Sequence, residues 1–146
     1  MVRLLPQDGV SGEEALILDD VLADVFTIHR YLHDLREQSV TIVPTRYVEP
    51  VRVERWALVR VLTMLLRDAK RVAKDANTNV RAVTESDEQW VRIEFRVGTP
   101  PVIDVPSGGG YAASIAEPFG GSIERKPGIV ALKLPTLKAR RAADRR

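Results

Sequence analysis

The segment Trp90–Val97, "WVRIEFRV", constrains the fold more than any other stretch of the chain because apolar and charged residues alternate along it. Its charged positions are Arg92, Glu94 and Arg96, and apolar residues stand between them. Successive side chains of a strand point to opposite faces, so the pattern predicts a sheet that is buried on one face and open to water on the other. A second β-like segment, residues 79–85, precedes it across a polar turn and predicts an antiparallel hairpin.

Two long helical patterns supply a layer that would cover the apolar face of this sheet. Residues 55–74 carry apolar side chains at helical spacing over a wide face, and residues 13–38 carry a second stripe that starts at a capping-box pattern, Ser11 and Glu14. The remaining elements are short β segments at 40–44 and 49–54, a short helix in "YAASIAE", and a last hairpin turning at Pro127–Gly128. We therefore expect an α+β fold, a two-layer α/β sandwich with helices on one face of a mixed, mostly antiparallel sheet.

Composition fits one globular domain in a chain of 146 residues with 45% hydrophobic and 29% charged residues. We expect a leader at residues 1–12, the domain at 13–136, and a basic tail, "LKARRAADRR", at 137–146. The tail has no aromatic residues, so nucleic-acid binding is not expected. The absence of cysteine excludes disulfides, thiolate catalysis and cysteine-based zinc sites. No apolar run could span a bilayer and no secretory signal is visible, which predicts a cytoplasmic protein without a membrane partner.

A run of three glycines, Gly108, Gly109 and Gly110, precedes the short helix, and Gly120–Gly121 follows it. Glycines before a helix allow backbone N–H groups to approach a phosphate. A glycine cluster by itself is also typical of a hinge or turn. The residues alone leave three interpretations open: a working phosphate loop, the remnant of one, and a flexible connection.

The order of these elements and several local strings resemble the ATP-binding domain of sensor histidine kinases, the Bergerat-type fold shared with gyrase-like and Hsp90-like ATPases. The resemblance covers about Leu16 to Pro135. The string "ERWALVRVLTMLLRDAKRVA" resembles the helix of the N box, "WVRIEFRVGTPPV" the strand before the adenine loop, and "PSGGGYAASIAEPFGGSIERKPGIVALKLP" the second glycine box and final hairpin. The part from "FGGSIE" onward is the most specific.

The resemblance implies residues that would hold Mg²⁺ and phosphate. In the family the N box has two asparagines on one helix face, and here their positions hold Met64 and Asp68. Methionine is a poor magnesium ligand, whereas the Asp68 carboxylate suits a hard cation. Arg71, one turn later, stands where the family often has a basic phosphate contact. The alternative for Asp68 and Arg71 is a solvated charged pair on a helix.

The resemblance also implies an adenine loop and a lid, and both depart from the family pattern. Val97 stands where the family has the aspartate that binds the adenine amine, and valine has no acceptor. Gly98 follows and would belong to the nucleotide site if ATP binding is retained, and then Thr99–Pro100–Pro101 replaces the expected glycine. Only six residues separate the prolines from Gly108, so the lid is nearly absent. Gly108, Gly109 and Gly110 align with the second glycine box and would form the phosphate loop if ATP binding is retained.

The two histidines, His29 and His33, lie in the first helical pattern. "HDLR", beginning at His33, resembles the phosphoacceptor box of histidine kinases, in which the neighbouring acid would act as base. That box belongs to a separate two-helix hairpin, and only one helix precedes the first β segment here. The phosphoacceptor role of His33 is therefore an alternative to a half-exposed surface histidine.

The function expected from these observations is that of a non-catalytic, degenerate histidine-kinase-like ATPase domain that acts as a protein-interaction or regulatory module in bacterial two-component signalling. Its expected partner is a response-regulator receiver, a kinase or a phosphotransfer protein, and the first helix is a candidate surface for a homodimer. No catalytic residue, cofactor or metal is expected. The alternatives are a kinase domain that binds ATP and Mg²⁺, with Asp68 holding the metal, and a phosphotransfer protein that uses His33.

Overall fold

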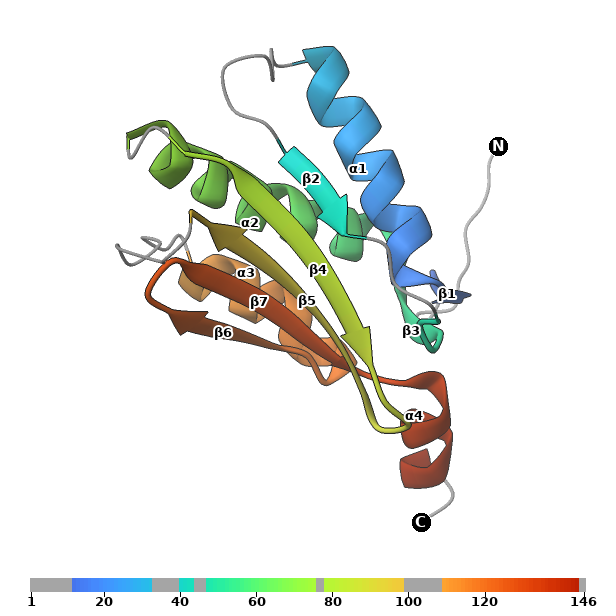
Figure 1. Cartoon of the computed structure of the whole chain (residues 1–146). Helices are drawn as coiled ribbons and strands as arrows, with labels where there is room; N and C mark the ends of the chain where they lie inside the picture. The colour runs from blue at the N-terminus through green and yellow to red at the C-terminus, as the bar shows by residue number, and fades with distance from the viewer. Residues whose placement is uncertain (1–11, 33–39, 44–46, 76–77, 99–108, 145–146) are drawn as a thin grey trace.

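A five-stranded mixed sheet forms one layer of the molecule, with its strands in the order β2-β4-β5-β7-β6 (Figure 1). The computed structural model describes residues 12–32, 40–43, 47–75, 78–98 and 109–144. Strand β2 runs parallel to β4, and all other neighbours in this sheet are antiparallel. The strands are β2 (Val40–Val43), β4 (Val80–Ser86), β5 (Trp90–Val97), β6 (Ser122–Lys126) and β7 (Ile129–Pro135). Both predicted hairpins are confirmed.

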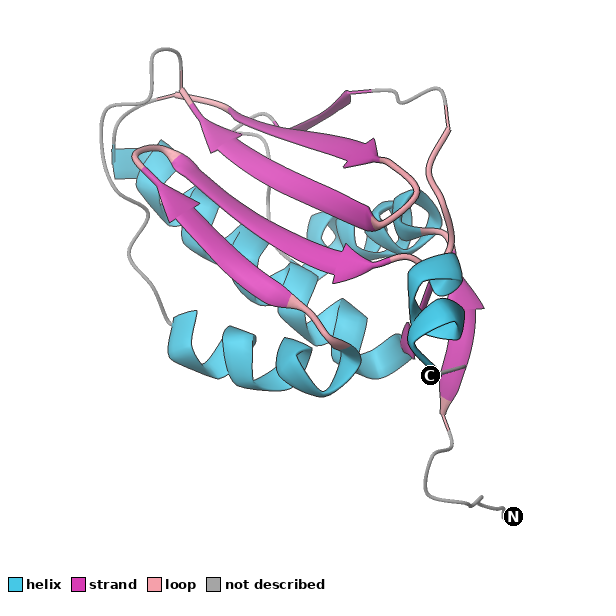
Figure 2. Ribbon diagram, turned by 90° about the horizontal axis from the view of Figure 1, so that it is seen from below, coloured by secondary structure: helices cyan, strands magenta, loops and turns pink. Residues whose placement is uncertain are grey.

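Three helices cover one face of the sheet: α1 (Leu18–Leu32), α2 (Arg55–Asp75) and α3 (Gly109–Ala116), which continues into a 3-10 turn at Glu117–Phe119 (Figure 2). Helix α2 is central, because it packs against α1, α3 and the strands β5 and β7. The apolar face of β5 is sealed by this layer, and Ile93 and Phe95 have no exposed surface. The predicted fold class, helices on one face of a mixed and mostly antiparallel sheet, is confirmed. Within the described residues, no helix is long and apolar enough to cross a membrane.

The start of the first helix was predicted wrongly. Residues Glu13–Leu16 form a strand, β1, which pairs antiparallel with β3 (Val51–Glu54), and α1 begins only at Leu18. Leu16 is buried opposite Val51 in this two-stranded ribbon, so the strand gains backbone pairing and apolar burial together. Because Glu14 lies inside β1, the Ser11–Glu14 capping box does not start a helix.

The expected basic tail begins with a helix, α4 (Leu137–Asp144), that packs on β3 and β7 (Figure 1). Thr136 is fully buried at its start, where the side-chain oxygen accepts a hydrogen bond from the Ala139 N–H at 3.0 Å. The same hydroxyl donates to the Glu88 carbonyl oxygen at 2.6 Å. Arg140 donates from Nη1 to the Arg52 carbonyl oxygen at 2.6 Å, so one of the basic residues anchors the helix.

The "FGG" string has a packing reason in this fold. Gly120 adopts φ 77° and ends the 3-10 turn in the left-handed region, which favours glycine. A Cβ atom on Gly121 would lie 2.7 Å from the Leu134 side chain, closer than Cβ atoms normally approach, and 3.1 Å from the Ala116 Cβ, which is tighter than most such contacts. The second glycine therefore lets the chain pass tightly from α3 into β6 over strand β7.

Candidate nucleotide site

The N-box positions of α2 differ in their surroundings. Met64 is partly buried and packs against the hydrophobic core. The Asp68 side chain is only 13% exposed, and its Oδ1 lies 3.9 Å from Nη2 of Arg71, whose own side chain is 61% exposed. The carboxylate of Asp68 is thus the one hard-cation donor that these three residues offer, and it already lies beside a positive charge.

The end of β5 lies where the resemblance places the adenine loop. Val97 is 3% exposed and belongs to the core, opposite Val80 of β4. Gly98 has φ 74°, and its N–H donates to the Asn79 carbonyl oxygen at 3.0 Å. A Cβ atom on Gly98 would lie 3.3 Å from the Thr78 methyl group. Turn geometry thus accounts for this glycine, and the buried Val97 side chain presents no acceptor to a ligand.

The structure describes two of the three glycines in the run. Gly109 and Gly110 are the first two residues of α3, whereas the expected helix began at Tyr111. Gly108 lies outside the described residues, as do the prolines at 100 and 101. The first N–H groups of any α-helix lack intrahelical partners, so the two helical glycines leave backbone donors without a covering side chain.

Helices α2 and α3 are joined by a contact that sequence reasoning missed. Arg60 donates a hydrogen bond from Nη2 to the Tyr111 hydroxyl oxygen, and its guanidinium carbon lies 5.5 Å from the centre of the Tyr111 ring. The contact holds the start of α3 against α2.

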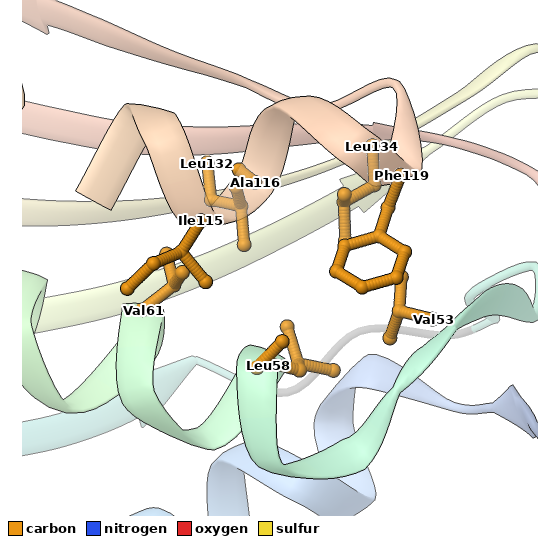
Figure 3. Close-up of a pocket in the computed structure, with 9 residues that line it drawn as sticks. Val53, Leu58, Val61, Ile115, Ala116, Phe119, Leu132 and Leu134 are labelled. Carbon is orange, nitrogen blue, oxygen red and sulfur yellow. The ribbon is translucent and has the colours of Figure 1, made fainter. Parts of the chain in front are cut away.

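A small apolar pocket lies deeper between the same two helices (Figure 3). Phe119 and Ile115 point from the α3 region toward Leu58 and Val61 of α2, and Leu132 and Leu134 of β7 lie behind them. Its cavity volume of about 10 Å³ suits roughly one water molecule. The lining is entirely apolar, so this pocket is a packing feature and not a nucleotide site.

Glu94, the most buried carboxylate among the described residues, lies on the other face of the sheet. Its side chain is 5% exposed and is held between two arginines of its own strand. Arg92 donates to one carboxylate oxygen, and Arg96 donates from Nε to the other at 2.7 Å. Arg92 also donates from Nε to Glu124 at 2.6 Å. Both carboxylate oxygens of Glu94 therefore accept hydrogen bonds from arginines.

The remaining titratable candidates do not form a site in the described part of the chain. His33 lies outside the described residues, and His29 belongs to α1 but its side chain is not described. No group of three or more His, Asp or Glu side chains in the described ranges could hold a metal ion. Asp87, in the β4–β5 turn, has a lowered pKa because its carboxylate accepts backbone hydrogen bonds from Trp90 and Gln89.

No family model and no curated protein matches the sequence. Solved structures do match the fold. The catalytic domain of histidine kinase ThkA matches with a TM-score of 0.66 at 17% sequence identity, over 85% of this chain and 97% of that one. The ATP-binding domain of PrrB from Mycobacterium tuberculosis gives 0.65 at 16% identity, over 86% and 98%. ThkA in complex with the response regulator TrrA gives 0.68 at 17% identity, over 86% of this chain and 42% of that one.

Two of these matches extend over nearly the whole length of a separate catalytic or ATP-binding domain. They agree with the arrangement of helices and strands described above. The chain therefore has the histidine-kinase-like ATPase fold, as the sequence predicted.

Proposed function

We propose that this chain is a degenerate histidine-kinase-like ATPase domain that carries out no nucleotide chemistry and acts as a protein-interaction or regulatory module in bacterial two-component signalling. The observation that carries the proposal is Val97. A site that binds adenine needs a polar partner for the adenine amine, and the side chain at this position is apolar and belongs to the core.

The N-box helix supports the same proposal. Met64 contributes to core packing, and Asp68 is the single oxygen ligand among the N-box positions. Mg²⁺ takes six oxygen ligands in strict geometry and usually shares them among carboxylates, phosphates and water. One carboxylate beside Arg71 is a poor basis for holding the metal of a nucleotide. ATP, if it were bound, would supply the phosphoryl group, while Asp68 would hold the metal and Arg71 would contact phosphate.

The partner we propose is another signalling protein: a response-regulator receiver, a kinase or a phosphotransfer protein. ThkA, whose catalytic domain shares this fold, forms a complex with the response regulator TrrA. A domain of this fold that has lost its nucleotide would keep an outer surface on which such a partner can dock.

Calorimetric titration with Mg·ATP tests the proposal. We expect no binding heat up to millimolar nucleotide, with the ATP-binding domain of PrrB as the positive control. The matched variants are Asp68→Ala and Asp24→Ala, because Asp24 is an exposed aspartate of α1. Micromolar binding that Asp68→Ala abolishes and Asp24→Ala retains would overturn the proposal in favour of an ATP-binding kinase domain.

A further inference from the structure

The outer face of α2 carries a row of side chains that we call the basic ridge: Trp56, Arg60, Arg67 and Arg71. Their spacings of four, seven and four residues place all of them within a sector of roughly 60° on an α-helix. The row extends for roughly 22 Å along the helix axis. Helices α1 and α3 both pack against α2, which is the central helix of the helical layer (Figure 2).

The side chains of the basic ridge are open to solvent and short of counter-charges. Trp56 is 69% exposed, and Arg60, Arg67 and Arg71 are all exposed. Among the described residues, no carboxylate lies within ion-pair distance of Arg60 or Arg67. Arg71 has Asp68 at 3.9 Å, the limit for such a pair. Two of the three arginines therefore have no carboxylate partner within the described part of the chain, and an acidic binding partner would supply that charge.

The aromatic residues at one end of the basic ridge point to a protein partner. Trp56 lies one turn before Arg60, and Tyr111, 57% exposed, lies under the Arg60 guanidinium. Tryptophan, tyrosine and arginine are the residue types that most often dominate the binding energy of protein interfaces. Tyr111 also orients Arg60 before any partner binds, which lowers the ordering cost of an interface.

We propose that the basic ridge, together with Tyr111, docks an acidic protein surface that presents an apolar or aromatic side chain between Trp56 and Tyr111. This deepens the proposed function and rests on it. A long polyanion such as nucleic acid fits less well, because the adjacent helix α1 exposes Asp20 and Asp24, which would repel a phosphate backbone running past the ridge. A compact acidic patch would engage the three arginines without meeting α1.

The test uses Trp56 as its own reporter. The chain has two tryptophans, so Trp90→Phe leaves Trp56 as the single tryptophan, whose emission can be excited selectively at the red edge of its absorption. The probe is a glutamate–tyrosine copolymer, which offers carboxylates and aromatic rings together, titrated at low and at high salt. We expect saturable binding that perturbs Trp56 fluorescence and weakens with salt. Absence of saturable binding to this copolymer at low salt would overturn the proposal.

Matched charge reversals locate the binding surface. The ridge variant is Arg60→Glu with Arg67→Glu, and the control is Arg81→Glu with Arg141→Glu, two exposed arginines on β4 and α4. We expect the ridge variant to lose affinity by about tenfold or more and the control to change little. Equal losses in both would show non-specific attraction and contradict the proposal. Tighter binding to single-stranded oligothymidylate than to the copolymer, with the same dependence on the ridge, would contradict it in favour of nucleic acid.

The variants leave Asp68 and Arg71 unchanged, so Mg·ATP titration of the same proteins reports the proposed function separately. ATP binding with intact copolymer binding would overturn the non-catalytic proposal and leave the docking surface standing. Absence of both ATP binding and copolymer binding would overturn the docking surface and leave the non-catalytic proposal standing. Circular dichroism of each variant checks that the fold is retained.

Discussion

Two groups of arginines lie on opposite layers of this molecule and differ in how their charges are balanced. On the open face of the sheet, Arg92 and Arg96 enclose the buried carboxylate of Glu94, and Arg92 reaches Glu124 as well. On the helical layer, Arg60 and Arg67 have no carboxylate partner in the described part of the chain. The paired charges around Glu94 therefore stabilise the fold, whereas the arginines of the helical layer are available to a binding partner.

The physical reason lies in the backbone that carries each group. Residues two apart on a strand share one face, so an arginine, a glutamate and a second arginine can pair directly along β5. Residues four and seven apart on a helix also share one face, but every charged position of the basic ridge is an arginine. The charges of the β5 group are paired within the fold, whereas the arginines of the basic ridge are left to pair with charges of a binding partner.

The largest expected effect comes from removing the carboxylate that Arg92 and Arg96 share. Glu94→Ala would leave Arg92 and Arg96 facing each other on one strand without the carboxylate that separates them, and we expect a loss of about 2–4 kcal/mol in the free energy of unfolding. Arg67→Ala is the control and should stay within about 0.5 kcal/mol, because its side chain is exposed and has no carboxylate partner among the described residues. Urea unfolding measures both. Equal losses would mean that the two arginine groups do not differ in role.

A second prediction concerns a substitution that should weaken binding without changing the stability of the fold. Trp56→Ala should weaken copolymer binding by about tenfold, measured by anisotropy of labelled copolymer, because an exposed tryptophan beside an arginine is typical of an interface anchor. Its free energy of unfolding should change little, since the ring is 69% exposed. The sheet-face counterpart is Trp90→Ala, which removes the ring under Lys133 and should leave binding unchanged. The comparison fails if Trp90→Ala weakens binding as much as Trp56→Ala does.

A third prediction concerns the contact between Arg60 of the basic ridge and Tyr111 of α3. Arg60→Ala, Tyr111→Ala and the double variant form a cycle in which we expect a coupling free energy of about 0.5–1 kcal/mol from the cation–ring contact. Thermal or urea unfolding of the four proteins gives the value. Strict additivity would show that Tyr111 does not orient Arg60, which would remove preorganisation from the docking argument.

The smallest expected effect concerns Asp87, an exposed carboxylate that backbone N–H groups, instead of arginines, stabilise. Its pKa is lowered from 3.8, so it adds stability above its unfolded-state pKa, and that contribution is lost as pH falls through the lower folded-state pKa. We expect wild type to be slightly more stable than Asp87→Asn at neutral pH, with the difference vanishing in the acid range. Unfolding of both proteins across pH measures it, and a constant difference would exclude the charge as its cause.

The periodic elements could be predicted from sequence because their signals are local. Alternation in β5 and helical spacing in α2 specify which face of each element is buried, and both were confirmed. The strand β1 and the helix α4 were not anticipated, because each is stabilised by partners distant in sequence. Leu16 is buried opposite Val51, and Arg140 donates to the Arg52 carbonyl oxygen.

The candidate site was predictable only in part. Asp68 and Arg71 could be placed on one helix three residues apart, and their pairing at 3.9 Å agrees with that. The position of Gly98 was identified, but its role in the turn depends on contact with Thr78 and Asn79, which the spacing of residues does not reveal. Gly108 and His33 lie outside the described residues, so their roles stay predictions.

The sequence by itself determined the fold class, since the period of apolar residues selects strand or helix and assigns the buried face of each. Only the tertiary structure decided which charged residues are satisfied. The sequence shows Glu94 between two arginines, but the burial of its side chain depends on the neighbouring strands. The hydrogen bond between Arg92 and Glu124 likewise depends on the position of β6. The exposure of the basic ridge likewise follows from how α1 and α3 pack beside α2. Ion pairing and burial depend on distance in space, which local sequence patterns do not encode.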